Sequence, residues 1–201
     1  MSTTSRPLRV VAVSGSLTDP SRTTALVEAI VEGFGRVIPI ESHVISLNKL
    51  GPHLAGTLSR KKLPEAAEQE LQRIETADLL IVATPVYRAS FTGLFKHTFD
   101  FVDQYALVDT PVLLAATGGS DRHALIIEHQ LRPLFAFFQS IVLPLGVYAQ
   151  DSDFENYQIS NEQLTERIEK AVSRALPLVK SSFAERVEVE RSLAGEEPAE
   201  E

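Results

Sequence analysis

Hydroxyl groups and one guanidinium gather between residues 14 and 23, where an apolar run ends and a helical pattern begins. Ser14, Ser16, Ser21 and Thr23 supply the hydroxyls, and Arg22 supplies the cation. Free amides at a helix start and the helix dipole favour a bound phosphate. Neither a Gly-Lys-Ser/Thr ending nor a full dinucleotide glycine fingerprint is present, so a monophosphate fits better. The alternative is a plain turn in which Ser21 or Thr23 only caps the helix.

A second segment of this kind follows the most apolar strand pattern in the chain. It consists of Pro85, Val86, Tyr87, Arg88, Ala89 and Ser90. A rigid proline, an aromatic ring and an exposed cation suit a loop that lines a flat ring, with Tyr87 beside it. Backbone amides near Arg88 to Ser90 are then available to hydrogen-bond the edge of that ring. The alternative is a loop folded over the sheet edge with Tyr87 half-buried.

A third loop is short and rich in glycine. It consists of Thr117, Gly118, Gly119 and Ser120. Backbone without side chains can approach a planar ligand closely, which makes this turn a candidate for the other end of the same ring. The alternative is a simple strand-to-helix turn, with Ser120 as the N-cap and Asp121 in the first turn.

The elements that position these loops are predicted from periodicity. Apolar runs indicate strands over 8–13, 41–47, 78–84, 111–117 and 141–148. Helical spacing indicates helices over 23–34, 64–75, 92–105, 122–138 and 161–180, with an irregular stretch over 48–63. Alternation of this kind predicts an α/β fold with a parallel sheet covered by helices on both faces. Because ligands of such sheets bind at the carboxyl ends of the strands, all three loops fall on one edge.

Composition places the chain among ordinary globular proteins. Its 201 residues are 44% hydrophobic and 23% charged, which suits a single domain over 1–180 followed by an acidic, disordered tail over 181–201. We expect a cytoplasmic protein with no membrane segment, because no apolar run is long enough for a signal peptide or a spanning helix. Cysteine is absent, which excludes disulfides, thiolate nucleophiles and cysteine-ligated metal centres.

Charge argues against a nucleic-acid partner, since the formal net charge is -8. Arg60, Lys61 and Lys62 form one basic cluster, which we interpret as a solvated loop. His97 and Asp100 have the spacing of metal ligands on a helix, but no third ligand is nearby, so we expect no metal site.

With these motifs in place, the sequence resembles the NADPH-dependent FMN reductase family. The resemblance covers roughly residues 8–148 and rests on Ser14-Gly15-Ser16 through Ser21-Arg22-Thr23, on Thr84-Pro85-Val86-Tyr87, and on Thr117-Gly118-Gly119-Ser120. The longer stretches Thr-Pro-Val-Tyr-Arg-Ala-Ser-Phe-Thr-Gly and Ala-Thr-Gly-Gly-Ser look like the flavin reductase components of bacterial sulfonate-desulfonating systems, above all the methanesulfonate type. The resemblance to the family implies a flavodoxin-like, doubly wound five-stranded sheet with strands in the order 2-1-3-4-5.

The resemblance also implies roles for the three loops. The first loop would hold the FMN phosphate, residues 85–90 would flank the ring, and residues 118–120 would meet its pyrimidine end. Related alkanesulfonate reductases carry a tyrosine inserted in the fourth helix, where it makes a π-bulge at the subunit interface, and His129 occupies that position here. We interpret His129 as a hydrogen-bonded interface residue in preference to a flavin contact. Pro133 predicts an irregular helix nearby.

The leading hypothesis is therefore an NAD(P)H:FMN oxidoreductase, with NADH slightly favoured, that supplies reduced FMN to a sulfonate monooxygenase in sulfur assimilation. No catalytic side chain is required, since the flavin itself carries the hydride transfer. One alternative keeps FMN bound and reduces a quinone, azo dye or chromate, and another is a flavodoxin-type electron carrier. A homodimer or homotetramer is expected, because Phe135, Phe137 and Phe138 exceed what one helix face needs to cover the sheet.

Overall fold

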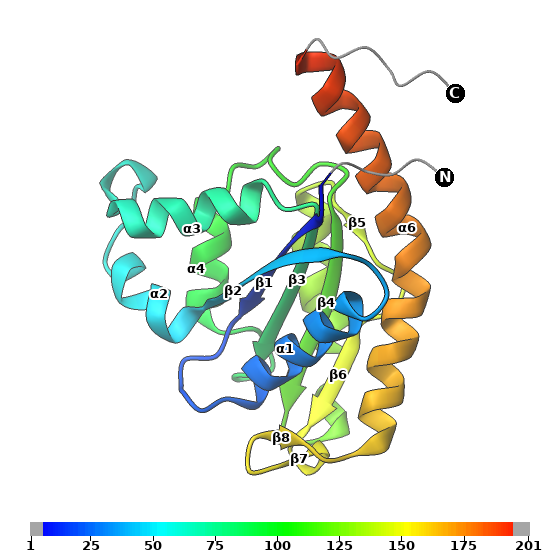
Figure 1. Ribbon diagram of the computed structural model, residues 1–201. Helices are drawn as coiled ribbons and strands as arrows, with labels where there is room; N and C mark the ends of the chain where they lie inside the picture. The colour runs from blue at the N-terminus through cyan, green and yellow to red at the C-terminus, as the bar shows by residue number, and fades with distance from the viewer. Residues whose placement is uncertain (1–5, 195–201) are drawn as a thin grey trace.

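The computed structural model describes residues 6–194, and a parallel sheet is at its centre (Figure 1). The strands are β1 (Leu8–Ser14), β2 (Ile40–Ser46), β3 (Leu79–Pro85), β4 (Pro111–Gly118), β5 (Ile141–Val142) and β6 (Val147–Gln150). Their order is β2-β1-β3-β4-β5, and β6 also pairs with β4. All of these pairings are parallel, so the predicted flavodoxin-like order is confirmed.

The fifth strand position differs from prediction because two short strands share it. β5 pairs with the start of β4 and β6 with its end, with the chain leaving the sheet between them. Pro144 cannot donate a hydrogen bond to the ladder, and Gly146 lies against Leu114 and Ile127, where a Cβ would come within 2.6 Å of the Ile127 side chain. The apolar run over 141–148 conceals this interruption.

Helices cover both faces of the sheet (Figure 1). The helices are α1 (Arg22–Gly35), α2 (Leu47–Leu54), α3 (Glu65–Glu75), α4 (Gly93–Phe101), α5 (Arg132–Phe137) and α6 (Glu162–Ala194). The apolar faces of α1 and α6 pack on one side of the sheet. Those of α2, α3, α4 and α5 pack on the other, where Phe95, Phe99 and Phe135 are fully buried or nearly so. The central strands β1, β3 and β4 are thus covered from both sides, as their continuous apolar patterns predict, whereas the polar edge strand β2 is partly exposed.

Short elements complete the chain. They are the 3₁₀ turns Arg60–Lys62, Asp121–His123 and Asp151–Asp153, the π-helix Ile127–Leu131, and the hairpin of β7 (Phe154–Glu155) and β8 (Gln158–Ile159). The stretch over 48–63, predicted to be irregular, contains all of α2 except its first residue, Leu47. Gly51 and Pro52 obscured that helix in the sequence, yet Leu47, Leu50 and Leu54 give it a buried face.

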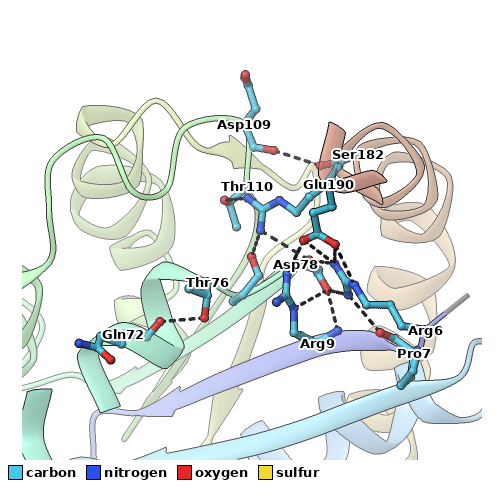
Figure 2. Close-up of polar contacts among 12 residues, drawn as sticks. Arg6, Pro7, Arg9, Gln72, Thr76, Asp78, Asp109, Thr110, Ser182 and Glu190 are labelled. Atoms are coloured by element: carbon cyan, nitrogen blue, oxygen red, sulfur yellow. Dashed lines mark hydrogen bonds and ion pairs between the residues drawn. The ribbon is translucent and has the colours of Figure 1, made fainter. Parts of the chain in front are cut away.

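The C-terminal helix extends beyond position 180, so the expected disordered tail is corrected for residues 181–194. Phe183 and Val187 continue the buried stripe of α6. Glu190 accepts hydrogen bonds from Arg6 and Arg9, which also bind the buried carboxylate of Asp78 (Figure 2). These contacts offset the conformational entropy lost when the segment becomes ordered. The charged composition of the segment gave no sign of them in the sequence. Residues 195–201 lie outside the described part of the chain.

Candidate flavin site at the carboxyl edge of the sheet

Parallel register brings the three predicted loops together. Ser14 is paired with Ala83, and Pro85 is paired with Thr117, so β1, β3 and β4 end side by side. The amide of Gly15 donates to the Ala83 carbonyl at 2.7 Å, and the amide of Val86 donates to the Thr117 carbonyl at 2.8 Å. The loops after these strands therefore share one edge, at the bottom of Figure 1.

Most hydroxyls of the first loop are bonded within the protein. Ser14 Oγ lies 2.8 Å from Thr24 Oγ1, and Ser16 Oγ donates to the Thr18 carbonyl at 3.1 Å. Ser21 is the N-cap of α1, and its Oγ accepts from the Thr24 amide at 3.3 Å. Ser21 therefore caps the helix, as the alternative interpretation expects. Ser14 and Ser16 are buried, and their hydrogen bonds shape the loop.

Two amides nevertheless remain available at the start of α1. Thr24 and Ala25 donate to Ser21, but the preceding amides of Arg22 and Thr23 donate to no atom of residues 6–194. Unpaired amides at a helix N-terminus, together with the helix dipole, attract an anion. This donor set fits a phosphate group.

Arg22, the first residue of α1, carries the cation of this loop. Its Nη1 donates to Asp151 Oδ1 at 3.2 Å, and its guanidinium carbon lies 5.6 Å from the centroid of the Tyr157 ring. Asp151 follows β6, and Tyr157 is in the β7–β8 hairpin. The guanidinium therefore lies at the N-terminus of α1, where a phosphate would bind, but it is already bonded to a carboxylate of the protein itself.

The second loop is a tight turn. Tyr87 and Ser90 exchange two backbone hydrogen bonds, of 2.9 and 3.1 Å, and the two residues between them have positive φ. Arg88 has φ 49° and Ala89 has φ 67°, so the backbone here is held in the left-handed region. Pro85 ends β3, Val86 is half-buried, and Tyr87 is 48% exposed. An exposed aromatic ring on a rigid turn can pack against a planar ligand.

The two glycines of the third loop have different surroundings. A Cβ on Gly118 would lie 2.3 Å from Tyr148 Oη, so the missing side chain makes room for that phenol. A Cβ on Gly119 would meet no atom within 4 Å, so only this glycine adjoins open space. The Tyr148 hydroxyl donates to the Ser120 carbonyl at 2.5 Å and so fixes the loop. Ser120 makes no side-chain cap.

Tyr148 stays a hydrogen-bond donor over a wide pH range. Burial raises the pKa of the Tyr148 phenol, and the nearby carboxylates of Asp151, Asp121 and Asp153 raise it further. The neutral phenol can therefore continue to hold the third loop in alkaline solution.

A buried hydrogen bond joins the first loop to the third. Thr23 Oγ1 and Thr117 Oγ1 lie 2.7 Å apart, and both residues are buried. The N-terminus of α1 and the end of β4 are therefore fixed relative to each other. A ligand that reaches from one loop to the other meets two prearranged surfaces.

The predicted irregularity near Pro133 is the π-helix Ile127–Leu131, which contains His129. The amide of Arg132 donates to the Ile127 carbonyl, five residues earlier, just before a proline that has no amide hydrogen. The His129 side chain is exposed. The neighbouring Gln130 accepts a hydrogen bond of 3.1 Å from Ser90 Oγ, which connects the π-helix to the second loop.

Sequence reasoning missed several residues that shape this edge. They are Thr24, Thr92, Tyr148, Asp151 and Tyr157. Thr92 caps α4 through the Phe95 amide and donates to the Gly15 carbonyl, and its position at the start of a predicted helix could have indicated that role. The contacts of Asp151 and Tyr157 with Arg22 span more than a hundred positions, and no local pattern indicates them.

Other candidate features lie elsewhere. His97 binds the Leu54 carbonyl and Asp100 pairs with Lys96, and no group of three or more His, Asp or Glu within residues 6–194 is arranged to hold a metal. Arg60, expected in a solvated loop, instead bonds Glu68 and Glu75.

Two hollows lie away from the three loops. One of about 410 Å³ lies between Gln150 and the first turns of α6, and another of about 230 Å³ lies beside β2. Neither contains a residue of the three loops.

The sheet order and its parallel pairings define a flavodoxin-like fold, with three loops gathered at its carboxyl edge. An oxidoreductase from Corynebacterium diphtheriae has a similar structure, with a TM-score of 0.77, 31% identity, and coverage of 88% of this chain and 99% of that one. An NADH:FMN oxidoreductase in its apo form matches with a TM-score of 0.74 and 29% identity over 85% of this chain and 89% of that one. A WrbA-like flavodoxin from Agrobacterium tumefaciens shares the fold at 16% identity, with a TM-score of 0.59, covering 87% of this chain and 99% of that one.

Sequence comparison narrows this class. The profile of the NADPH-dependent FMN reductase family matches residues 8–155, and the chain belongs to that family. An NADH-dependent FMN reductase, SfnF, from Pseudomonas fluorescens is 58% identical over 87% of this chain and 93% of its own length. An FMN reductase (NADPH) from Pseudomonas aeruginosa is 55% identical over 86% of this chain and 92% of its own. The predicted enzyme class, an NAD(P)H:FMN oxidoreductase, is confirmed.

Proposed function

We propose that the three loops form the FMN site of this reductase, with the phosphate at the start of α1. The observation that carries the proposal is the pair of unpaired amides, Arg22 and Thr23, at a helix N-terminus that the Thr23–Thr117 hydrogen bond joins to the glycine loop. Ser14, Ser16, Ser21 and Arg22 complete the phosphate loop, residues 85–90 flank the ring, and Thr117 to Ser120 meet its pyrimidine end.

In this arrangement the protein binds and orients, while bound FMN supplies the acceptor for hydride from the nicotinamide. The amides at the start of α1 and the Arg22 guanidinium hold the negative charge of the phosphate. Tyr87 packs against the ring, and the backbone beside Gly119 approaches it without a side chain in between. Positioning two rings in contact is the main contribution that such a site makes to the rate.

The phosphate assignment is tested by titrating the apoprotein with FMN and following flavin fluorescence together with NADH and NADPH oxidation. Arg22→Ala is expected to weaken FMN binding about ten-fold to a hundred-fold, because one charge-assisted contact is lost. Arg36→Ala, at the other end of α1, is the matched control and should leave the affinity unchanged. If Arg22→Ala binds FMN as tightly as the parent chain, Arg22 is not part of the site.

We further propose that NADH is the preferred donor and that reduced FMN passes to a partner sulfonate monooxygenase in the cytoplasm. The motif resemblance of the second and third loops supports the partner. The NADH dependence named for the relative SfnF, at 58% identity, supports the donor, whereas the Pseudomonas aeruginosa relative at 55% identity is named for NADPH. Among residues 6–194 no helix is long and apolar enough to cross a membrane. The ratio of kcat/KM for NADH and NADPH, and sulfite release in a coupled assay with the monooxygenase, test both points.

The same assay separates the alternatives. Free FMN is a substrate in the proposed function, so NADH oxidation should require added flavin. Steady oxidation by the FMN-loaded protein without added flavin, with a quinone, azo dye or chromate as acceptor, would favour the bound-FMN alternative. A flavin-loaded protein that oxidises no nicotinamide would favour the electron carrier.

We also propose a homodimer or homotetramer that uses the surface around α5. Of the three phenylalanines behind this expectation, Phe135 and Phe138 belong to the core, but Phe137 is 64% exposed and Leu125 is exposed nearby. His129 is also exposed, in the π-helix that leads into α5. Light scattering after gel filtration tests the assembly, and Phe137→Asp should shift it toward smaller species.

A further inference from the structure

The cation assigned to the FMN phosphate already has an anionic partner within the chain. Arg22 Nη1 donates to Asp151 Oδ1 at 3.2 Å, and the Tyr157 ring lies beside the same guanidinium. Both charged side chains are about half exposed, at 42% for Arg22 and 55% for Asp151. The pair is therefore open to solvent, and an incoming anion can reach it.

The fold fixes the position of Asp151. Gln150, the last residue of β6, is in register with Gly118 at the end of β4, so the next residue emerges at the ligand edge. The Gln150 amide donates to the buried carboxylate of Asp153 at 2.9 Å, which holds the turn over 151–153. Asp153 in turn accepts from Asn161 and Arg167. Asp151 thus comes to the start of α1 on a braced turn.

Tyr157 is held with similar rigidity. Asn156 and Tyr157 have φ of 48° and 63°, and they form the turn between β7 and β8. This conformation directs the hairpin toward Arg22, whose guanidinium carbon is 5.6 Å from the ring centroid. A cation beside an aromatic face is weakly attracted to it, so Tyr157 keeps Arg22 near Asp151 without neutralising it.

We propose that Asp151 is an internal counter-ion that competes with the FMN phosphate for Arg22 and so limits the affinity for FMN. The inference rests on the proposed function, because it requires the phosphate to bind at the start of α1. A phosphate that reaches Arg22 must displace the Asp151 carboxylate or share the guanidinium with it, and the two anions repel each other. For a reductase that releases its flavin, a lower affinity is useful, because weaker binding of FMN allows the flavin to dissociate faster.

The test compares FMN with riboflavin, which has the same ring but no phosphate. Asp151→Asn keeps the size of the side chain and removes its charge. It should tighten FMN binding about three-fold to five-fold, as expected for the loss of one exposed ion pair, and leave riboflavin binding unchanged. The dissociation constants are measured by quenching of flavin fluorescence with the full chain. Glu155→Gln, which removes one charge from the adjacent hairpin, is the matched control and should change neither constant.

A second comparison isolates the role of Arg22. In an Arg22→Ala background the Asp151→Asn change should lose most of its effect on FMN, because the competition has no cation left to act on. If Asp151→Asn leaves FMN affinity unchanged or weakens it, the inference is wrong while the FMN site itself stands. Equal tightening by Glu155→Gln would mean that net charge alone is responsible, which also overturns it. A parent chain that fails to bind FMN would overturn the proposed function as well.

Discussion

Buried polar groups occur at both ends of the sheet, but they are satisfied differently. At the amino end, the Asp78 carboxylate has no exposed side-chain surface and accepts hydrogen bonds from the Arg9 amide and from the side chains of Arg6 and Arg9 (Figure 2). Around the three loops at the carboxyl end, neutral hydroxyls are bonded to one another, as in the 2.7 Å contact of Thr23 and Thr117. The unpaired amides of Arg22 and Thr23, at the start of α1, lie in the same loop as the Thr23 hydroxyl.

This difference separates a structural cluster from a ligand site. Arg186 adds to the first cluster by donating to the Ala77 carbonyl and to Thr110, so the guanidinium groups there donate to acceptors within the chain. The carboxyl edge keeps donors that an anion can use. Charged residues packed together indicate stability here, whereas small hydroxyl residues around open amides indicate binding.

The largest expected effect concerns Asp78. Asp78→Asn should lower the free energy of unfolding by about 3–5 kcal/mol, because the arginines around it lose their buried partner. Urea unfolding measures the change. Glu190→Gln, which removes an exposed carboxylate from the same cluster, should cost less than about 1 kcal/mol. Equal losses in the two variants would remove the distinction between the buried and exposed carboxylates.

Acid should weaken the same cluster. Burial alone would raise the pKa of Asp78, but hydrogen bonds from Arg6 and Arg9 outweigh it and lower the pKa below its ordinary value. The stabilisation is therefore complete above the unfolded pKa of about 3.9 and is lost as the pH falls through the lower folded value. Unfolding followed between neutral and acidic pH should show a shallower acid loss in Asp78→Asn than in the parent chain.

The glycine loop gives the next largest effect. Gly118→Ala should destabilise the protein by about 1–3 kcal/mol, because the new Cβ would collide with Tyr148 Oη. Adding Tyr148→Phe, which removes that oxygen, should recover part of the loss. Gly119→Ala should leave thermal stability unchanged within about 0.5 kcal/mol but weaken FMN binding, since only its Cβ would enter the open space beside the ring. Unchanged FMN affinity in Gly119→Ala would point to a different position for the ring.

The hydroxyl pair gives the smallest effect. Thr23→Val should cost roughly 1 kcal/mol because it leaves the Thr117 hydroxyl buried without a partner. Thr23→Val combined with Thr117→Val should cost less than the sum of the two single changes, since both unsatisfied groups are then removed. Thermal unfolding of the four proteins checks this cycle, and strict additivity would mean that the two hydroxyls do not stabilise each other.

Periodicity was sufficient to predict the first four strands and their carboxyl edge, because buried parallel strands carry strong patterns, but it missed the division of the fifth strand into β5 and β6 and the short helix α2. The continuation of α6 past position 180 was concealed, since Phe183 and Val187 are isolated among charged residues. Within the site, the loops could be predicted from their own residues. The pairing of Arg22 with Asp151 could not, because it depends on how β6 aligns with β4.

The Asp78 cluster also determines where the two ends of the described chain emerge. Arg6, just before β1, and Glu190, near the end of α6, are 184 positions apart and bonded directly. In Figure 1 the start of β1 and the end of α6 lie opposite the carboxyl ends of the strands. A fusion joined before Arg6 or after Ala194 would start from the side of the sheet opposite the three loops. The protein could therefore be tethered to an electrode or a scaffold through either end while the three loops at the carboxyl edge stay open to the solution.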